Sequence, residues 1–382
     1  MNTRRTMLRA AFASALPCIL PAEPSLALWQ RYALGLADVQ GRVIDRSAGD
    51  RTTSEGQAYG LFFALVAGDS ERFDRILSWT QSHLAGGDLG RALPAWLYGR
   101  TAGGMDSILD ANSAADADLW LAYTLVQAGH IWQNERYTQL GQRLASLIAA
   151  QEVGELPGLG AMLLPGASGF VKQAGVYQLN PSYLPLQIFA GLAQAQPGGP
   201  WQRIAENVPR VIVGSAPSGY ALDWVAYRSG AGFSAEPSHY GKPLASYDAI
   251  RVYLWAGMLD PGTPGLPQIL PSLHGMGEHL KKVAFPAAEI LPDGVVSNAL
   301  SPVGFSAAVM PYLAAIGDRP SLARQSQRVR QRLESGSDLR YYDICLALFA
   351  LGWAEGRYRF DSQGRLMLKR SGNGAGSGGI GR

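Results

Sequence analysis

Three carboxylic acids stand where a helix is predicted to begin, and each could either stabilise that helix or transfer a proton. The first is Glu55, in Thr52-Thr53-Ser54-Glu55 directly before an apolar helical run. A threonine followed three residues later by a glutamate forms a capping box, in which Thr52 caps the helix and Glu55 folds back onto the cap amide. The pattern alone favours this interpretation.

The alternative role for Glu55 is that of a general acid, which sets a physical condition. The N-terminus of a helix stabilises a carboxylate and lowers its pKa. A general acid must keep its proton instead, so Glu55 would need burial or a second carboxyl group close by. The sequence offers two such groups.

Asp116 and Asp248 are the two candidate neighbours. Asp116 shares a helical face with Leu119 and Tyr123, which are predicted to point into the core, whereas Asp118 does not. An ionisable group on an inward face is costly unless it is paired or functional. A helix cap or first-turn acid explains Asp116 equally well.

Asp248 repeats the pattern, with Val252 and Trp255 at i+4 and i+7 on the same helical face. Arg251 follows at i+3 and is a ready ion-pair partner that would keep Asp248 charged. Spacing alone slightly favours a helix-stabilising pair over a functional one.

Aromatic side chains also cluster near acids, glycines and prolines. They are Trp96, Tyr98, Trp120, Tyr183, Trp224, Tyr247 and Trp255. Sugar rings stack on aromatic faces and carboxylates bind sugar hydroxyls, so the grouping is compatible with a carbohydrate site. Any single tryptophan is more often part of a core.

Other chemistries find little support, and we predict no metal site and no cofactor. Of the histidines His83, His130, His239, His274 and His279, the last two are five residues apart, which misses zincin spacing. No glycine-rich segment has the lysine and spacing of a phosphate loop. A formal charge of +3 over 382 residues does not favour nucleic-acid binding.

The elements that must position these residues are mostly helices. Apolar segments with a period of 3.6 residues lie near 28–40, 56–67, 70–84, 115–131, 136–150, 182–195, 201–214, 245–258, 266–283, 304–316, 320–334 and 339–354. Residues 357–368 are predicted to form a terminal hairpin. We expect a single all-α domain over 28–368, either a toroid of about twelve helices or an α-solenoid.

The two ends have a different composition. Residues 1–27 combine Arg4 and Arg5 with a short apolar run and a small-residue end, which predicts a signal peptide, no stable membrane insertion, and a periplasmic or secreted protein. Cys345 would then be the only remaining cysteine, and its apolar surroundings predict a buried thiol. The glycine-rich tail 369–382 is predicted to be disordered.

The acidic segments also resemble the motifs of glycoside hydrolase family 8. Thr52 to Gly60 is similar to the acid segment of that family, Asn112 to Trp120 to its second signature, and Ser246 to Arg251 to its third acid segment. Further segments occur in the expected order and resemble the endoglucanases that accompany bacterial cellulose synthase. They are 41–45, 93–99, 180–185, 223–225 and 302–308.

This resemblance implies an (α/α)6 barrel that hydrolyses β-1,4-glucan with inversion. Glu55 would protonate the glycosidic oxygen and Asp248 would activate water, with their carboxyl groups about 6.5–9.5 Å apart. Asp116, the third implied catalytic residue, would bind the sugar at the cleavage subsite and help set the pKa of Glu55, although some descriptions of the motif give it the role of nucleophile. Arg251 would orient Asp248 or balance its charge. The residues implied to bind glucan are Trp96, Tyr183, Trp224, Tyr247 and Arg251.

The sequence departs from the family pattern at two places. Ala115 replaces the usual serine or threonine, and Lys281 to Phe285 replaces an expected Pro-Pro-Glu stretch.

Three hypotheses for the function stay open. The first is a cellulase acting in cellulose biosynthesis in association with the synthase complex. The second is a chitosanase, xylanase or mixed-linkage glucanase, and the third is a non-catalytic glucan-binding scaffold.

Overall fold

The computed structural model describes residues 24–369, except 174, 238–240 and 336–339. Most of the predicted signal peptide, His239 and all but the first residue of the predicted tail lie outside the described residues. The described ranges contain thirteen α-helices, which are α1 (Pro24–Gly35), α2 (Ser54–Ala67), α3 (Ser70–Leu84), α4 (Ala115–Ile131), α5 (Glu135–Gln151), α6 (Leu186–Ala195), α7 (Trp201–Gly214), α8 (Ile250–Gly257), α9 (Leu266–Ser272), α10 (His274–Lys282), α11 (Val303–Ala315), α12 (Arg319–Glu334) and α13 (Tyr341–Ala354).

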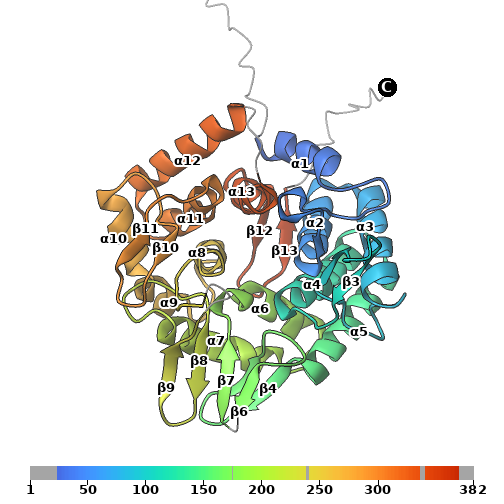
Figure 1. The fold of residues 1–382 in the computed structure, drawn as a ribbon, viewed down its shortest axis with the longest axis horizontal. Coiled ribbons are helices and arrows are strands. Elements are labelled where there is room, and N and C mark those ends of the chain that lie inside the picture. Colours follow the sequence, from blue (N-terminus) through green and yellow to red (C-terminus); the bar gives the residue numbers. More distant parts are fainter. Residues whose placement is uncertain (1–23, 174, 238–240, 336–339, 370–382) are drawn as a thin grey trace, which may run out of the picture.

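Six of these helices form an inner ring. Helices α2, α4, α6, α8, α11 and α13 are apolar on most sides, and each contacts the next in this order. The ring closes where Phe62 of α2 stacks on Phe349 of α13, with ring centroids 5.4 Å apart. A helix that is apolar all round must be buried, which explains why these six helices surround the centre in Figure 1.

The remaining helices form an outer ring. Five of them contact the inner helix that directly precedes them in the chain; these are α3, α5, α7, α9 and α12. Helix α1 contacts α13. Helices α3, α5, α7, α10 and α12 carry buried residues along one face only. Two concentric helix rings make an (α/α)6 barrel, so the predicted toroid is confirmed and the solenoid alternative is wrong.

All twelve predicted helical segments contain helix, and one of them contains two. Residues 266–283 divide into α9 and α10, because Pro271 has no N–H to donate and α9 ends one residue later. The two helices are adjacent, with α10 beginning at His274. This division accounts for the thirteenth helix.

Short strands lie in the segments between the helices and after the last one, and most of them were not predicted. They form a sheet of β1 (Thr52–Thr53), β2 (Leu97–Arg100) and β3 (Asp106–Asp110), a sheet of β6 (Val171–Gln173), β7 (Val176–Leu179), β8 (Val225–Arg228) and β9 (Gly232–Ala235), and the pairs β4 (Val153–Leu156) with β5 (Gly160–Leu163), β10 (Glu289–Ile290) with β11 (Val296–Asn298), and β12 (Tyr358–Phe360) with β13 (Leu366–Leu368). All pairings are antiparallel. The last pair confirms the predicted hairpin.

The inner helices pack closely around an aromatic centre. Tyr59, Phe62, Trp120 and Phe349 contact one another through edge-to-face and tilted rings. At the α8–α11 crossing, a Cβ atom on Gly257 would lie 2.1 Å from the Tyr312 backbone nitrogen, so only glycine allows this approach. Tight packing of this kind holds the helix ends, and therefore the acids on them, in fixed positions.

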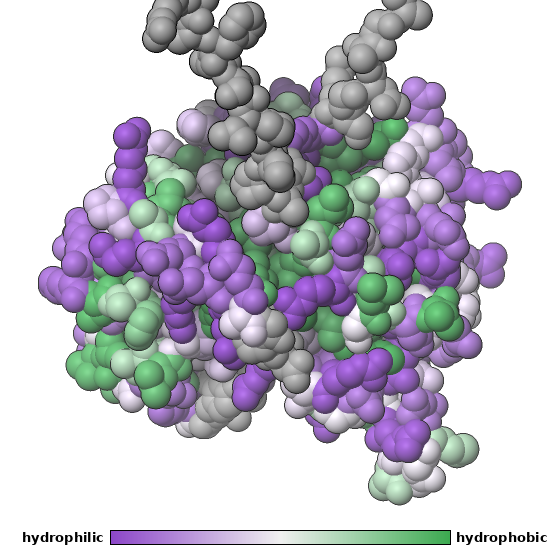
Figure 2. Space-filling view, turned by 90° about the horizontal axis from the view of Figure 1, so that it is seen from above, coloured by the Kyte–Doolittle hydropathy of each residue, from purple (hydrophilic) through white to green (hydrophobic). Residues whose placement is uncertain are grey.

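The surface differs from this core. Figure 2 shows the face that carries α1 and α12, where hydrophilic residues predominate and hydrophobic ones appear in smaller groups. Cys345 is buried, as predicted. Among the helices of the described ranges, none is both long and apolar enough to cross a membrane.

Candidate active site

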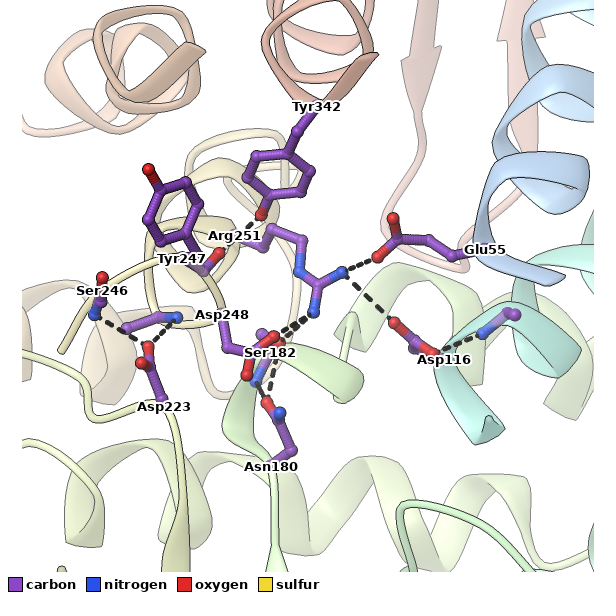
Figure 3. A network of polar contacts seen from close by, with 12 residues as sticks. Glu55, Asp116, Asn180, Ser182, Asp223, Ser246, Tyr247, Asp248, Arg251 and Tyr342 are labelled. Atoms are coloured by element: carbon purple, nitrogen blue, oxygen red, sulfur yellow. Dashed lines mark hydrogen bonds and ion pairs between the residues drawn. The ribbon is translucent and has the colours of Figure 1, made fainter. Parts of the chain in front are cut away.

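Glu55 lies in the first turn of α2, and the predicted capping box is wrong. The cap is Thr53, whose Oγ1 accepts a hydrogen bond from the Gly56 amide at 3.1 Å. Thr52 is engaged elsewhere, because its hydroxyl donates to the Val43 carbonyl oxygen at 2.7 Å. With the cap made by Thr53, the Glu55 side chain extends toward Arg251 (Figure 3).

Asp116 lies in the first turn of α4 and faces the centre, which confirms its predicted orientation. Its Oδ1 accepts from the Ala117 amide at 2.8 Å, and its Oδ2 accepts from Arg251 Nη1 at 3.3 Å. Asp118, which we predicted to face away from the core, is also fully buried. The prediction was wrong because α4 belongs to the inner ring and has protein on every side.

Arg251 joins all three acids. Its side chain is only 3% exposed, and Nη2 donates to Asp248 Oδ1 at 2.8 Å, the predicted i,i+3 pair. Nη1 donates to Glu55 Oε2 and to Asp116 Oδ2. The Asp248–Arg251 pair therefore does more than stabilise α8, because it brings together acids from α2, from α4 and from the segment before α8 (Figure 3).

Burial at this centre raises the pKa of two of the acids, Glu55 and Asp116. Burial raises the pKa of Glu55, the Arg251 charge opposes the shift, and the charge of Asp248 adds to it. The pKa of Asp116 is raised to about 7 by burial against the opposing Arg251 charge, with Glu55 adding to the rise. Burial and the Asp248 charge thus oppose the pull of the helix terminus on the pKa of Glu55.

A fourth acid, Asp223, positions the segment that carries Asp248. Its Oδ1 accepts from the amides of Ser246 and Ala249, both at 2.8 Å, on either side of Asp248. Burial, and then the charge of Asp248, raise the pKa of Asp223 to about 7. The Asp223 side chain thereby fixes the backbone on both sides of Asp248.

The predicted glucan-binding aromatics take different positions. The Arg251 guanidinium carbon lies 5.6 Å from the ring centre of Tyr183, and Trp224 meets Tyr183 edge to face at 6.1 Å. Trp224 also stacks on Phe170 at 6.1 Å with the planes 4° apart. Tyr183 and Trp224 thus form a continuous aromatic surface that begins at Arg251.

Trp96 and Tyr247 lie at other edges of the site. The Trp96 carbonyl oxygen accepts from the Ser54 amide, so Trp96 adjoins the start of α2 beside Glu55. The Tyr247 ring packs against Phe305 and Tyr342 and points away from the guanidinium in Figure 3. Trp96 is thus brought beside Glu55 by a backbone hydrogen bond, and Tyr247 is beside Asp248 because it precedes it in the chain. Neither contact is made by the aromatic ring.

Several residues at the site were not predicted. Ser182 Oγ accepts from Arg251 Nη2 at 2.9 Å, Tyr59 accepts from Nη1 at 3.3 Å, and the Tyr341 hydroxyl donates to Glu55 Oε1 at 3.4 Å. Ser182 and Asp223 lie within segments that carried the family resemblance, which was the available signal. Tyr341 lies in the last helix and gave no signal, because only closure of the ring brings α13 against α2.

Metal binding is not suggested by the described part of the chain. No group of three or more histidine, cysteine, aspartate or glutamate side chains there is arranged to hold a metal ion. The three acids at the centre are instead paired with Arg251. The predicted absence of a metal and of a cofactor stays a prediction.

A double ring of helices with carboxyl groups gathered at its centre defines a class, that of the (α/α)6-barrel glycoside hydrolases. Residues 4–356 match the model of the glycosyl hydrolases family 8. The chain therefore belongs to glycoside hydrolase family 8, which confirms the resemblance seen in its motifs.

Individual relatives agree with this assignment. The chain is 45% identical to an endoglucanase of Xanthomonas axonopodis pv. citri, over 96% of this chain and 97% of the relative, and 40% identical to an endoglucanase of Escherichia coli K12, over 94% of both. A crystal structure of an endo-1,4-D-glucanase from Vibrio fischeri matches with a TM-score of 0.85 at 38% identity, over 90% of this chain and 99% of that one.

Proposed function

We propose that this protein is an endo-β-1,4-glucanase (a cellulase) that hydrolyses internal bonds of a cellulose chain with inversion. The relatives named endoglucanases, at 40–45% identity over nearly the whole chain, support the activity. The observation that carries the proposal is that one buried guanidinium holds Glu55 on Nη1 and Asp248 on Nη2. An inverting glycosidase uses two such carboxyl groups, one as acid and one as base, about 6.5–9.5 Å apart.

Glu55 is the proposed general acid. Its Oε2 accepts from Arg251, so the proton it keeps would be on Oε1, which faces the Tyr341 hydroxyl. Burial supplies the raised pKa that a proton donor needs near neutral pH. About one fifth of the Glu55 side chain is exposed, at 21%, which leaves the carboxyl group accessible to a glycosidic oxygen.

Asp248 is the proposed general base, and it is ion-paired with Arg251. The Asp248 side chain is 20% exposed, so a water molecule can reach it. The base would take a proton from that water while the water attacks the anomeric carbon on the face opposite Glu55. Asp116 is proposed to bind sugar hydroxyls between the two and, through its charge, to help raise the pKa of Glu55.

The aromatic residues are proposed to hold the glucan chain. Tyr183 and Trp224 would stack on glucosyl rings on one side of the acids. Trp96 would contact the glucan beside Glu55, and Tyr247 would contact it beside Asp248. Because the sequence also resembles endoglucanases that accompany cellulose synthase, we propose a periplasmic or secreted enzyme, exported through residues 1–27. It would act on cellulose during its synthesis, in association with the synthase complex.

Substrate and stereochemistry can be tested together. We expect the purified enzyme to release reducing sugar from carboxymethyl-cellulose faster than from chitosan, xylan or mixed-linkage glucan. Proton NMR of fresh cello-oligosaccharide digests should show the α-anomer first, since inversion converts a β-linkage. Activity on chitosan or xylan alone would reject the cellulase, β-anomeric products would reject inversion, and no hydrolysis of any glucan would favour a scaffold.

A further inference from the structure

Two buried acids behind Asp116 have no role in the mechanism proposed above. Asp118 lies two residues further along α4, and Glu152 follows the last residue of α5. Both side chains are fully buried. A buried carboxyl group is costly unless it is neutralised or hydrogen-bonded, so this pair calls for an explanation.

The carboxyl groups of Asp118 and Glu152 lie within hydrogen-bonding reach of each other. Ser113 Oγ donates to Glu152 Oε1 at 2.5 Å. Within the described ranges, no donor reaches Glu152 Oε2 or either oxygen of Asp118. An ionised carboxylate only accepts hydrogen bonds, so the two groups can bond only while one of them keeps a proton.

The pair lies where several segments meet behind the site. The Ser113 hydroxyl that donates to Glu152 also accepts from the Ala167 amide at 3.0 Å, and the Leu164 amide donates to the Glu152 carbonyl oxygen at 2.7 Å. The Ala115 amide, at the start of α4, donates to the Pro165 carbonyl oxygen at 3.0 Å. A bond between Asp118 and Glu152 therefore ties the first turn of α4 to the end of α5 and to residues 164–167.

We propose that Asp118 and Glu152 share a proton, and that this bridge is a positioning device that fixes the helix turn carrying Asp116. The role in hydrolysis rests on the proposed function, whereas the shared proton does not. Asp118 contributes the proton and Glu152 accepts it, with Ser113 holding the other oxygen of Glu152. Neither acid touches the substrate.

The charges around the bridge agree with this assignment. The ionisable groups that act on Asp118 are Glu152, from the end of α5, and Asp116, from its own helix. Burial raises the pKa of Asp118 well above its usual value and raises that of Glu152 to about 7. A bridge that holds one proton carries one negative charge, and by reciprocity that charge raises the pKa of Asp116.

Matched substitutions separate the proton from the packing. In Asp118→Asn the amide can donate to Glu152 without a titrating proton, so the bridge and its negative charge remain. In Asp118→Ala the bridge is lost, Glu152 stays neutral over a wider pH range, and the pKa of Asp116 falls. We expect Asp118→Ala to lower kcat on carboxymethyl-cellulose at least tenfold and to move the acidic limb of kcat/KM to lower pH, and Asp118→Asn to restore both.

Infrared spectroscopy at pH 8 tests the proton without reference to hydrolysis. The difference between wild type and Asp118→Asn should contain the carbonyl stretch of one protonated carboxyl group, shifted in deuterated water. Absence of that band overturns the shared proton, even in an active enzyme or if Asp118→Ala fails to fold. Wild-type kcat in Asp118→Ala, or failure of Asp118→Asn to restore kcat, overturns the positioning role. A band in a protein without hydrolytic activity would reject only the proposed function.

Discussion

Replacement of Arg251 by methionine removes the cation that three acids share. The Arg251 and Asp116 side chains are 3% and 6% exposed, so Asp116 would lose its counter-charge in a buried site. Removal of one partner from a buried ion pair costs about 3–5 kcal/mol of unfolding free energy. Glu55 and Asp248 reach solvent, which places the expected loss near the lower end. We expect kcat/KM to fall roughly 10²–10³-fold, as for the loss of one preorganised charge-stabilising group.

The loss of stability should depend on pH in a defined direction. Arg251 lowers the pKa of Asp116 and of Glu55, so both values rise without it. A carboxyl group with a raised folded pKa contributes stability below its unfolded pKa, and this is lost as the pH rises through the folded pKa. For Asp116 that window runs from 3.8 to about 7 in the wild type. Both proteins lose this contribution alike inside the window, so the part of the Arg251→Met deficit that is due to Asp116 should grow as the pH rises above about 7.

Urea unfolding at several pH values and reducing-sugar release from carboxymethyl-cellulose measure the two effects. Arg203→Met is the matched control, because Arg203 pairs with Glu155 at the surface, where the side chains are 61% and 62% exposed and such pairs are worth about 0–1 kcal/mol. Arg251→Lys keeps the charge but cannot serve two carboxylates from separate nitrogens, so its activity should be intermediate. The reasoning is refuted if Arg251→Met is no less stable than Arg203→Met, or if Arg251→Lys has wild-type kcat/KM.

Three further predictions follow from the geometry of the site. Asp223→Ala leaves the Ser246 and Ala249 amides without their acceptor, so the free energy of unfolding in urea should fall by about 1–3 kcal/mol and kcat should fall as well. The oxygen of Asp223→Asn can still accept, so this variant should recover most of the stability and of kcat. Trp224→Ala should raise KM for cello-oligosaccharides about tenfold, roughly 1.4 kcal/mol of lost stacking, with kcat little changed; an unchanged KM would remove Trp224 from the groove. Dialysis against a chelator should leave the hydrolysis rate unchanged, and a loss restored by added metal would contradict the roles given to the carboxyl groups.

Local patterns predicted the helices well because each inner helix carries its own signal. Long apolar runs with a 3.6-residue period gave all twelve segments, and the only division missed was at Pro271. The strands were mostly missed because they are two to five residues long and pair with distant segments, as Thr52–Thr53 do with Leu97–Tyr98. The terminal hairpin was predictable because both of its strands are adjacent in the chain.

Errors at the site have the same origin. Asp118 was predicted to face solvent because helical periodicity assumes one solvent-exposed face, whereas α4 is buried on all faces over the turns around Asp118. The capping box was placed on Thr52 because the motif fits by spacing, whereas the Thr52 hydroxyl is already bonded to Val43. Arg251 was predicted as a partner of Asp248 alone, since its bonds to Glu55 and Asp116 exist only once α2, α4 and α8 meet in the ring.

The rate of carboxymethyl-cellulose hydrolysis by Glu55→Gln tests the central claim most directly. Glutamine keeps the size of the side chain and can still accept from Arg251, but it has no acidic proton to give. We predict a fall in rate of roughly 10²–10⁴-fold, the usual contribution of a general acid, with wild-type urea unfolding and wild-type binding of cello-oligosaccharides. A rate within tenfold of the wild type in a folded, glucan-binding variant would contradict the assignment of Glu55 as the acid.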